Sequence, residues 1–298
     1  MNRDILILAV LDGVSYAGLL FLVALGLTFI FGVVRILNVA HGSLYACGGY
    51  AAASLGLWLG GGSLGVSIAA LVGASIAVGI VLGTALMLLL GRFQDRDPIL
   101  QLLVTFGAFM IVEDLQRMIW GTQPYFVADV VNQMGTSELL GVVYMNYQLL
   151  FVPAAALVVY AVLQWFLKRT LTGRQIIAVT HDREVATAMG INAKRIAYLT
   201  FLVGAMLGAL GGALASPTTS LVPGIGADMI VLSFAVVATA GLGQISGALV
   251  TALMIGLARS FCVYLYPELE VVMPYAIMVL VLLVRPQGLF TVAQARRI

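Results

Sequence analysis

Charged residues are scarce in this sequence. Only 9% of its 298 residues are Asp, Glu, Lys or Arg, whereas 62% are hydrophobic and the mean hydropathy is +1.08. A soluble globular domain carries about 25% charged residues, so the composition excludes that class and indicates a membrane protein. Apolar runs recur along the chain, and a run of about 20 residues is long enough to cross a bilayer as an α-helix.

Lysine, cysteine and histidine are also rare, with two of each in the whole chain. Neither Lys168 nor Lys194 follows a glycine-rich P-loop pattern, so we expect no ATP site of that type here. Cys47 and Cys262 lie in apolar surroundings without C-x-x-C spacing, and we expect both to be small buried side chains. The motifs H-E-x-x-H and G-x-S-x-G are absent, so we expect a non-enzyme that needs no cofactor or metal.

Nine apolar segments predict membrane helices: residues 5–31, 39–59, 64–90, 98–119, 147–167, 196–215, 229–240, 245–265 and 271–284. Some are short or broken, so we expect an all-α, polytopic membrane helix bundle with roughly 8–10 transmembrane segments. Asp97 is a suitable N-cap and Pro98 a suitable first residue for the fourth helix. We expect residues 1–298 to form a single transmembrane domain.

The 33 glycines lie inside the apolar segments as well as between them. Two sets repeat at four-residue spacing: Gly79 and Gly83, and Gly204, Gly208 and Gly212. Because small residues at this spacing let helix backbones approach closely in lipid, we expect a tightly packed bundle.

Basic residues gather in only some of the breaks between apolar segments. They include six Lys and Arg residues in 168–195, two in the break after residue 90, and three at the C-terminus: Arg285, Arg296 and Arg297. The breaks at 120–146, 216–228 and 266–270 contain no Lys or Arg. By the positive-inside rule, the basic breaks and the C-terminus face the cytoplasm, and alternation of the segments puts the N-terminus outside.

The polar stretch 168–195 contains the signature of a short capped helix. Asp182 suits the N-cap, Glu184 complements the dipole of the first turn, and Gly190 suits a left-handed position after the last turn. A short helix at the membrane surface has a suitable shape for docking on a soluble partner. The alternative is an ordinary amphipathic loop helix.

Two stretches interrupt the apolar pattern, at 35–45 and 241–247. Irregular backbone at membrane depth survives only where it is buried in protein or lines a wet cavity, so such stretches point to a transport pathway. In the first stretch, His41 contacts substrate or gates the pathway, or else makes a structural hydrogen bond that braces the junction. Asn38 is a candidate cap for the helix that follows, and Ser43 and Tyr45 are candidates to face the pathway.

Glu113 is an ionisable residue within a predicted span, which makes it a candidate pathway residue. Arg117 lies one turn further on and can pair with it, whereas we expect Asp114 to point elsewhere on the helix. The alternative role for Glu113 is a neutralised pair near the outer boundary. Asp12 is a weaker case of the same kind.

The pattern R-x-x-N-x-A-H-G-x-x-Y at 35–45 resembles a motif of LivH-type inner-membrane permeases of branched-chain amino-acid ABC importers. The resemblance covers nearly the whole chain and continues in family order through 49–50, 182–184, 190–192, 241–248 and 285–290. The stretch 168–195 also resembles the coupling loop of ABC importers, whose pattern is E-A-A followed by G. The residues that the resemblance assigns to ATPase coupling are Asp182, Arg183, Glu184, Ala186 and Gly190, with Val185 in place of the middle alanine.

The resemblance implies a channel-forming permease subunit that imports a small amino acid, most often a branched-chain one, and is powered by separate ATPase subunits. The implied partners are a homologous second permease (LivM-like), two ATP-binding subunits and a periplasmic substrate-binding protein that docks on the breaks free of Lys and Arg. The implied location is the bacterial inner membrane, with the lipid bilayer around the chain and no nucleic-acid partner.

One position departs from the family pattern, because Arg259 stands where relatives often carry an acidic residue. It falls in the outer half of its segment, where a basic side chain can reach outward to water. Related permeases act on urea, short amides or aromatic acids, and these substrates stay open. A different class, an ion-coupled secondary transporter, would need acidic ligands inside the spans, for which Glu113 and Asp12 are the only candidates.

Overall fold

The computed structural model describes residues 3–59, 62–93 and 96–290, and most of them are helical. The helices are α1 (Arg3–Val34), α2 (His41–Leu59), α3 (Leu64–Gly91), α4 (Pro98–Trp120), α5 (Asp129–Met134), α6 (Val152–Arg169), α7 (Leu171–His181), α8 (Arg183–Ala188), α9 (Ala193–Ala215), α10 (Ile225–Ala240), α11 (Ile245–Leu265) and α12 (Met273–Val284). A π-helical turn, η1 (Tyr147–Phe151), precedes α6, and a short 3-10 turn, η2 (Pro267–Leu269), follows α11. The only strands among the described residues, β1 (Thr136–Leu139) and β2 (Val142–Met145), form an antiparallel hairpin.

The predicted all-α polytopic bundle is confirmed. Within the described residues, six helices are long and apolar enough to cross a membrane, namely α1, α3, α4, η1 with α6, α9 and α11. The other three predicted segments are helical but shorter or less apolar. At about 1.5 Å per residue, α10 and α12 rise about 24 Å and 18 Å, less than the ~30 Å of a hydrocarbon core.

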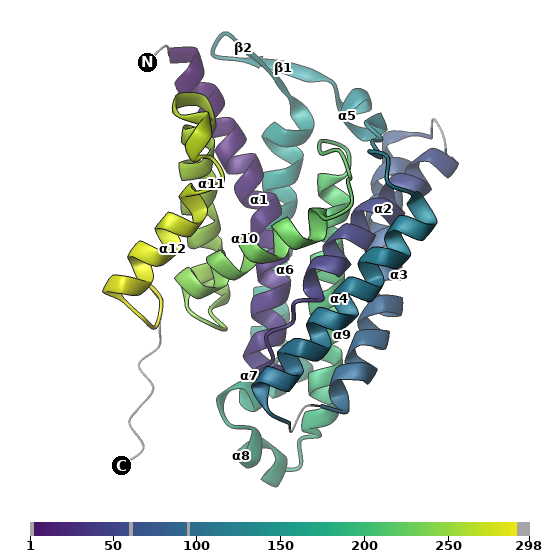
Figure 1. Cartoon of the computed structure of the whole chain (residues 1–298), viewed down its shortest axis with the longest axis vertical. Helices are drawn as coiled ribbons and strands as arrows, with labels where there is room; N and C mark the ends of the chain where they lie inside the picture. The colour runs from purple at the N-terminus through teal and green to yellow at the C-terminus, as the bar shows by residue number, and fades with distance from the viewer. Residues whose placement is uncertain (1–2, 60–61, 94–95, 291–298) are drawn as a thin grey trace.

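Helix α1 forms the centre of the bundle and packs against α6, α9, α10 and α11 (Figure 1). In its most apolar 18-residue window, 89% of the residues are buried, compared with 17% in α4. Phe21, Leu22 and Leu25 of α1 are fully buried. A helix that is apolar on every side is stable only when other helices surround it, whereas α4 and α12 lie at the periphery and leave apolar faces exposed.

The glycines of α9 let α1 and α2 approach it closely, as their spacing predicts. A Cβ atom added at Gly204 would lie 2.8 Å from the carbonyl oxygen of Gly26 on α1, and one at Gly212 would overlap the carbonyl oxygen of Tyr45 on α2. The predicted small residues of α3 pack on α9 in the same way: Gly79 and Gly83. Helix packing in this bundle therefore depends on the absence of side chains at these positions.

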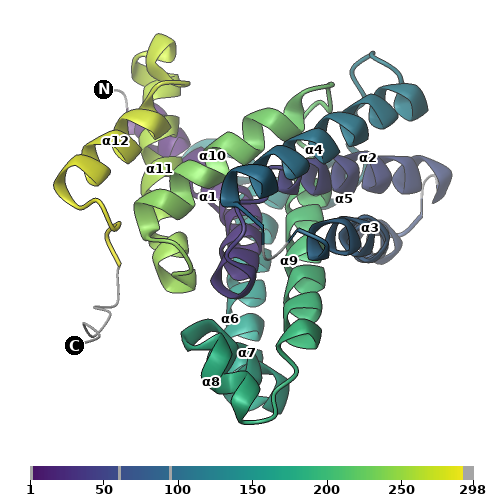
Figure 2. The same ribbon diagram turned by 60° about the horizontal axis from the view of Figure 1, so that its bottom comes forward.

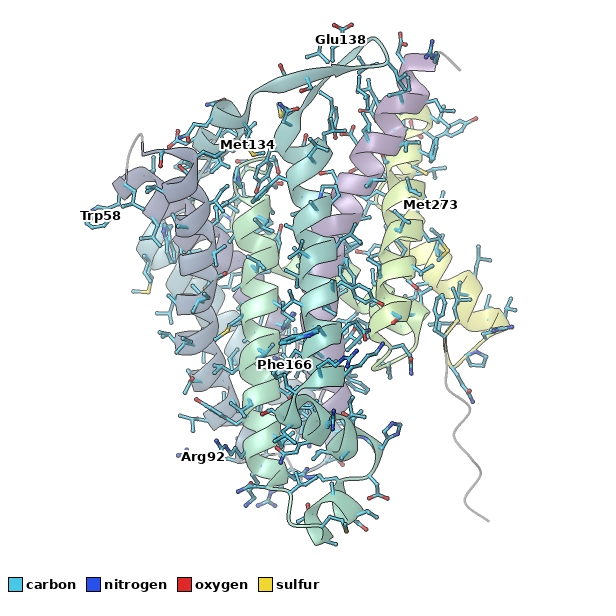
Figure 3. The ribbon with its side chains drawn as sticks, turned by 180° about the vertical axis from the view of Figure 1, so that it is seen from behind. Trp58, Arg92, Met134, Glu138, Phe166 and Met273 are labelled. Atoms are coloured by element: carbon cyan, nitrogen blue, oxygen red, sulfur yellow. The ribbon has the colours of Figure 1, made fainter. Side chains whose placement is uncertain are left out.

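The two ends of the bundle differ in charge (Figure 3). Arg92 lies at one end, together with α7 and α8, whereas Trp58, Met134 and Glu138 lie at the other. We call these the basic end and the hairpin end. Helix α1 begins at the hairpin end (Figure 1), and α7 and α8 project from the basic end (Figure 2). The predicted orientation stays a prediction, and Arg296 and Arg297 lie outside the described residues.

The predicted helix start at residue 98 is present, because a side-chain oxygen of Asp97 accepts a hydrogen bond from the backbone N–H of Ile99 at 2.8 Å. The prediction that both cysteines are small buried side chains is confirmed for Cys262 and wrong for Cys47. Cys262 is buried, and Cys47 is half-buried and accepts a hydrogen bond from Nε2 of Gln116.

The interruption at 241–247 is a tight turn between α10 and α11. Gly241 and Gly243 have φ angles of +103° and +83°, which favour glycine because it has no Cβ. The chain after α12 returns to this turn, where the backbone N–H groups of Leu289 and Phe290 donate to the carbonyl oxygens of Thr239 and Ala240 at 2.9 Å and 3.0 Å. Two stretches that both carry the family resemblance, 241–248 and 285–290, thus lie together, through bonds that join residues 50 positions apart in the sequence.

Candidate functional site

The junction between α1 and α2 combines buried and exposed residues. Helix α1 ends at Val34, and α2 begins at His41. The first residue of the connection, Arg35, has a φ of +55°, which is costly for a residue other than glycine and marks a sharp change of direction. Asn38 and His41 are fully buried, whereas Arg35 and Leu37 are exposed, so protein covers the irregular backbone from residue 38 onward but not its first residues.

His41 connects three helices. Its Nε2 atom donates to the carbonyl oxygen of Val23 on α1 at 3.1 Å, because a carbonyl can only accept. The ring fills the space left by two glycines: a Cβ atom would lie 3.0 Å from ring atom Cε1 if added at Gly26 of α1, and 2.7 Å if added at Gly208 of α9. The geometry therefore favours the bracing role for His41 over direct substrate contact.

Several polar atoms at this junction are buried without a hydrogen-bond partner among the described residues. They are both side-chain polar atoms of Asn38, Nδ1 of His41 and Oγ of Ser43. The predicted capping role of the Asn38 side chain is wrong, because the turn instead presents the backbone carbonyl of Asn38 to the N–H of His41 at 3.2 Å. An unpaired buried polar atom costs about 1–3 kcal/mol, so the junction keeps its polar groups at an energetic cost.

Tyr45 lies one turn into α2 and is buried. Its backbone packs against Gly212 of α9. The structure thus brings Asn38, His41, Ser43 and Tyr45 together in one buried region, on either side of the first turn of α2.

Glu113 does not belong to this region. It lies on α4 and pairs with Arg117, with 2.5 Å between Oε1 and Nη2. The expectation that Asp114 points elsewhere is wrong, because its Oδ1 lies 3.2 Å from Nη1 of the same arginine. Residues at i+3 and i+4 are both neighbours on a helix, so one guanidinium reaches both carboxylates. This is the neutralised arrangement that the sequence left as the alternative for Glu113.

The helix predicted in the polar stretch is α8, and its caps are those predicted. Oδ1 of Asp182 accepts hydrogen bonds from the N–H groups of Glu184 and Val185, both at 3.0 Å. At the other end, Gly190 has a φ of +85°, and Ile191 N–H donates to the carbonyl oxygen of Ala186 at 3.1 Å. This pattern is a Schellman motif, which glycine favours because of its positive φ.

The exposed face of α8 differs from the one that the family pattern suggests. Ala186, which the resemblance assigns to coupling, is only 4% exposed. The side chains that face outward are Val185 and Met189, at 59% and 80% exposure. They lie four residues apart and therefore share one face of the helix. An exposed apolar pair beside the charged residues Arg183 and Glu184 is suited to a protein contact.

A direct contact connects the α1–α2 junction to the region of α8. Nη2 of Arg35 donates to the backbone carbonyl of Thr180 at 3.3 Å, two residues before the α8 cap. A cavity of about 140 Å³ lies beside this contact, lined by residues of α1, α6 and α7 and of the α10–α11 turn, among them Thr28, Thr180 and Gly243.

Two charged residues near the hairpin end have partners that sequence reasoning missed. Asp12 of α1 accepts hydrogen bonds from the hydroxyls of Tyr144 on β2 and Tyr264 on α11. Burial, and then the bond to Asp12, raises the pKa of Tyr144 above its usual range. Arg259 pairs with Glu270, and its guanidinium carbon lies 4.1 Å from the ring centroid of Tyr16, so it turns into the protein instead of reaching outward alone.

Comparison with known proteins gives one consistent result. A family model described as "Branched-chain amino acid transport system / permease component" matches residues 9–282. The branched-chain amino acid permease BraD of Pseudomonas aeruginosa is 26% identical over 287 residues, covering 93% of each chain. LivH of Escherichia coli is 27% identical over 289 residues, also covering 93% of each chain. A probable LivH of Methanocaldococcus jannaschii is 29% identical over 266 residues, covering 86% of this chain and 81% of that one.

Proposed function

The chain belongs to the family of branched-chain amino acid transport system permease components, and on this premise we propose that it is the channel-forming subunit of a binding-protein-dependent ABC importer. It moves a branched-chain amino acid (leucine, isoleucine or valine) into the cytoplasm. The observation that carries the proposal is the family match over residues 9–282, together with a surface helix suited to docking on a separate motor. The chain is a multi-pass membrane protein, and ATP hydrolysis belongs to its partners.

Coupling to ATP hydrolysis takes place at α8. Val185 and Met189 seat in a groove of an ATP-binding subunit, and Arg183 and Glu184 form charge-assisted bonds at its rim. The buried Ala186 anchors the helix on the bundle, which the contacts of α8 with α7 and α9 support. In this assembly the coupling segment is 168–195 of a single transmembrane domain, 1–298, and a homologous permease presents a second such helix to a second ATP-binding subunit.

The buried region around His41 lies on the translocation pathway. The unpaired polar atoms of Asn38, His41 and Ser43 support this role, because opening a path past them would supply hydrogen-bond partners. The Arg35–Thr180 hydrogen bond connects α7, at the basic end, to the α1–α2 junction. A shift of α7 and α8 would therefore move the start of α2. His41 itself acts as a brace, and Glu113 acts in an ion-pair cluster on α4.

The basic end faces the cytoplasm of a bacterial inner membrane, and the hairpin end faces the periplasm. The excess of Lys and Arg in the breaks at the basic end supports this orientation. A substrate-binding protein docks at the hairpin end, on 120–146, 216–228 and 266–270. The antiparallel hairpin of β1 and β2 supports such contact, because it exposes Leu140 and Val143 there.

Co-purification with the ATP-binding subunits tests this function. Met189→Asp places a charge on the exposed face of α8, whereas Trp58→Asp is a matched change at an equally exposed apolar residue at the hairpin end, far from the coupling segment. We expect Met189→Asp to lower recovery of the ATP-binding subunits about ten-fold and Trp58→Asp to leave it near the unmodified level. Equal recovery for all three chains would contradict docking at α8. Uptake by the purified chain alone, driven by an ion gradient, would support the secondary-transporter alternative instead.

A further inference from the structure

Bonds between distant parts of the chain join the three breaks that carry no Lys or Arg, 120–146, 216–228 and 266–270. We call the exposed residues of these breaks the hairpin-end surface. An antiparallel bridge joins the first two breaks, because the backbone N–H groups of Tyr125 and Leu221 each donate to the carbonyl oxygen of the other residue at 2.9 Å. The bridge fixes the position of one break relative to the other.

Asp12 connects the first and third breaks through α1. One of its carboxylate oxygens accepts a hydrogen bond from the hydroxyl of Tyr144 on β2, and the other accepts one from the hydroxyl of Tyr264 on α11. Tyr144 is buried, and Tyr264 lies two residues before the third break. The hairpin and the end of α11 therefore share one anchor on the central helix.

Aromatic rings hold the start of the first break against α2. Trp120 stacks on Tyr50 of α2 with 5.1 Å between ring centroids, and its Nε1 donates to Oγ of Ser54 at 2.7 Å. The ring of Tyr125 lies 6.2 Å from the same Tyr50. The hairpin-end surface is thus held in one arrangement before a partner arrives, so binding to it orders few groups.

The hairpin-end surface carries negative charge (Figure 3). Its exposed carboxylates without an ion-pair partner among the described residues are those of Glu138, Asp228 and Glu268. The nearby Arg117 and Arg259 are paired with carboxylates, and Arg3 is followed directly by Asp4. A surface with unpaired carboxylates and no basic residue of its own favours a partner with basic residues.

Exposed apolar side chains accompany these carboxylates. Leu140 and Val143 of the hairpin are 61% and 66% exposed, and Tyr266 of the third break is 67% exposed. Apolar and aromatic groups with a charged rim are typical of a contact with another protein. A metal ion is a poor occupant, because the described residues contain no group of three His, Cys, Asp or Glu side chains that could hold one.

We propose that the hairpin-end surface recognises a basic face of the substrate-binding protein, and that Asp12 positions the hairpin for this contact. The inference rests on the proposed function, which supplies the partner, and it adds the sign of the charge on the partner's docking face. Attraction between opposite charges speeds the encounter, and the apolar side chains of the hairpin then hold the complex.

The experiment measures association of the binding protein with the complete importer in lipid nanodiscs over a range of salt concentrations. The double change Glu138→Gln and Glu268→Gln removes two exposed carboxylates. We expect association to be about ten-fold slower at about 0.05 M salt and to differ by less than about two-fold at about 1 M, where charges are screened within about 3 Å. Ser137→Gln is the matched control, because it places the same side chain on the same exposed strand without changing the charge. It should leave the rate unchanged.

Asp12→Asn tests the positioning role separately. It weakens the bonds to Tyr144 and Tyr264 beneath the hairpin, so we expect dissociation to be about three-fold faster at every salt concentration. The salt dependence of association should stay that of the unmodified importer, because the exposed carboxylates are unchanged. Full affinity of Asp12→Asn would overturn the positioning role.

The outcomes separate this inference from the proposed function. Association that does not change with salt, or equal rates for the double variant and the unmodified importer, would overturn recognition by charge. Binding itself would still uphold the proposed function in both cases. Absence of association at every salt concentration would overturn both.

Discussion

Helix α8 and the α1–α2 junction differ in how far along the chain their contacts reach. The hydrogen bonds that cap α8 all lie between Asp182 and Ile191. Each of them joins two residues no more than five positions apart in the sequence. At the junction, His41 instead bonds to Val23 and packs against Gly208, so its contacts come from two other helices. A surface helix built from local contacts can meet a partner without disturbing the bundle. The junction can change only when several helices move together.

The strongest test of this difference is the close packing behind the junction. Gly212→Ala would overlap the backbone of Tyr45 and separate α9 from α2, so we expect it to destabilise the protein by about 3 kcal/mol. Gly107→Ala is the matched control, since a Cβ there meets nothing within 4 Å; it should be neutral or slightly stabilising. Thermal unfolding in detergent measures both. Equal melting temperatures for the two variants would show that the interior is less tightly packed than described.

The two histidines provide the next test. His41→Ala removes a hydrogen bond and leaves a void between Gly26 and Gly208, so we expect a loss of stability of about 2 kcal/mol and a lower folded yield. His181→Ala changes an exposed residue of α7 and should leave the yield unchanged. Normal yield of His41→Ala with abolished transport would reverse the assignment and make His41 a pathway residue.

At α8 the expected effect is smaller and separate from folding. Gly190→Asp forces a residue with a Cβ into the left-handed region, which costs about 1–2 kcal/mol and loosens the end of the helix. We expect roughly ten-fold weaker association with the ATP-binding subunits at unchanged membrane insertion. Glu184→Lys, which reverses a charge at the rim of the docking face, should act in the same direction. Membrane extracts that retain the ATP-binding subunits at full level would contradict the role of this helix.

The smallest effect is expected on α4. Glu113→Gln removes one of two carboxylates that share Arg117, and exposed pairs of this kind contribute about 0–1 kcal/mol. Uptake should stay within about two-fold of the unmodified importer, as it should for Asp114→Asn. A selective loss of uptake in Glu113→Gln would restore Glu113 as a pathway residue.

The fold and α8 could be predicted because their signals are local. Apolar segment length predicted the helices, and Asp182 with Gly190 predicted both ends of α8. The exposed face of α8 could not be predicted, since the inward position of Ala186 depends on how α8 lies against the rest of the bundle. The prediction that the Asn38 side chain caps α2 was wrong for a related reason. In the turn after Arg35, the backbone carbonyl of Asn38 accepts the hydrogen bond from His41 N–H that the side chain was expected to accept.

The sequence by itself determined which segments form membrane helices, which end is basic and where the short surface helix begins and ends. These properties depend on side-chain hydropathy, charge and capping, all of which act within a few turns of the chain. Only the tertiary structure decided that His41 fills a space between two glycines, and that Arg259 contacts Tyr16 and Glu270. Such contacts depend on the rotation and depth of whole helices relative to one another, and packing against neighbouring helices sets both.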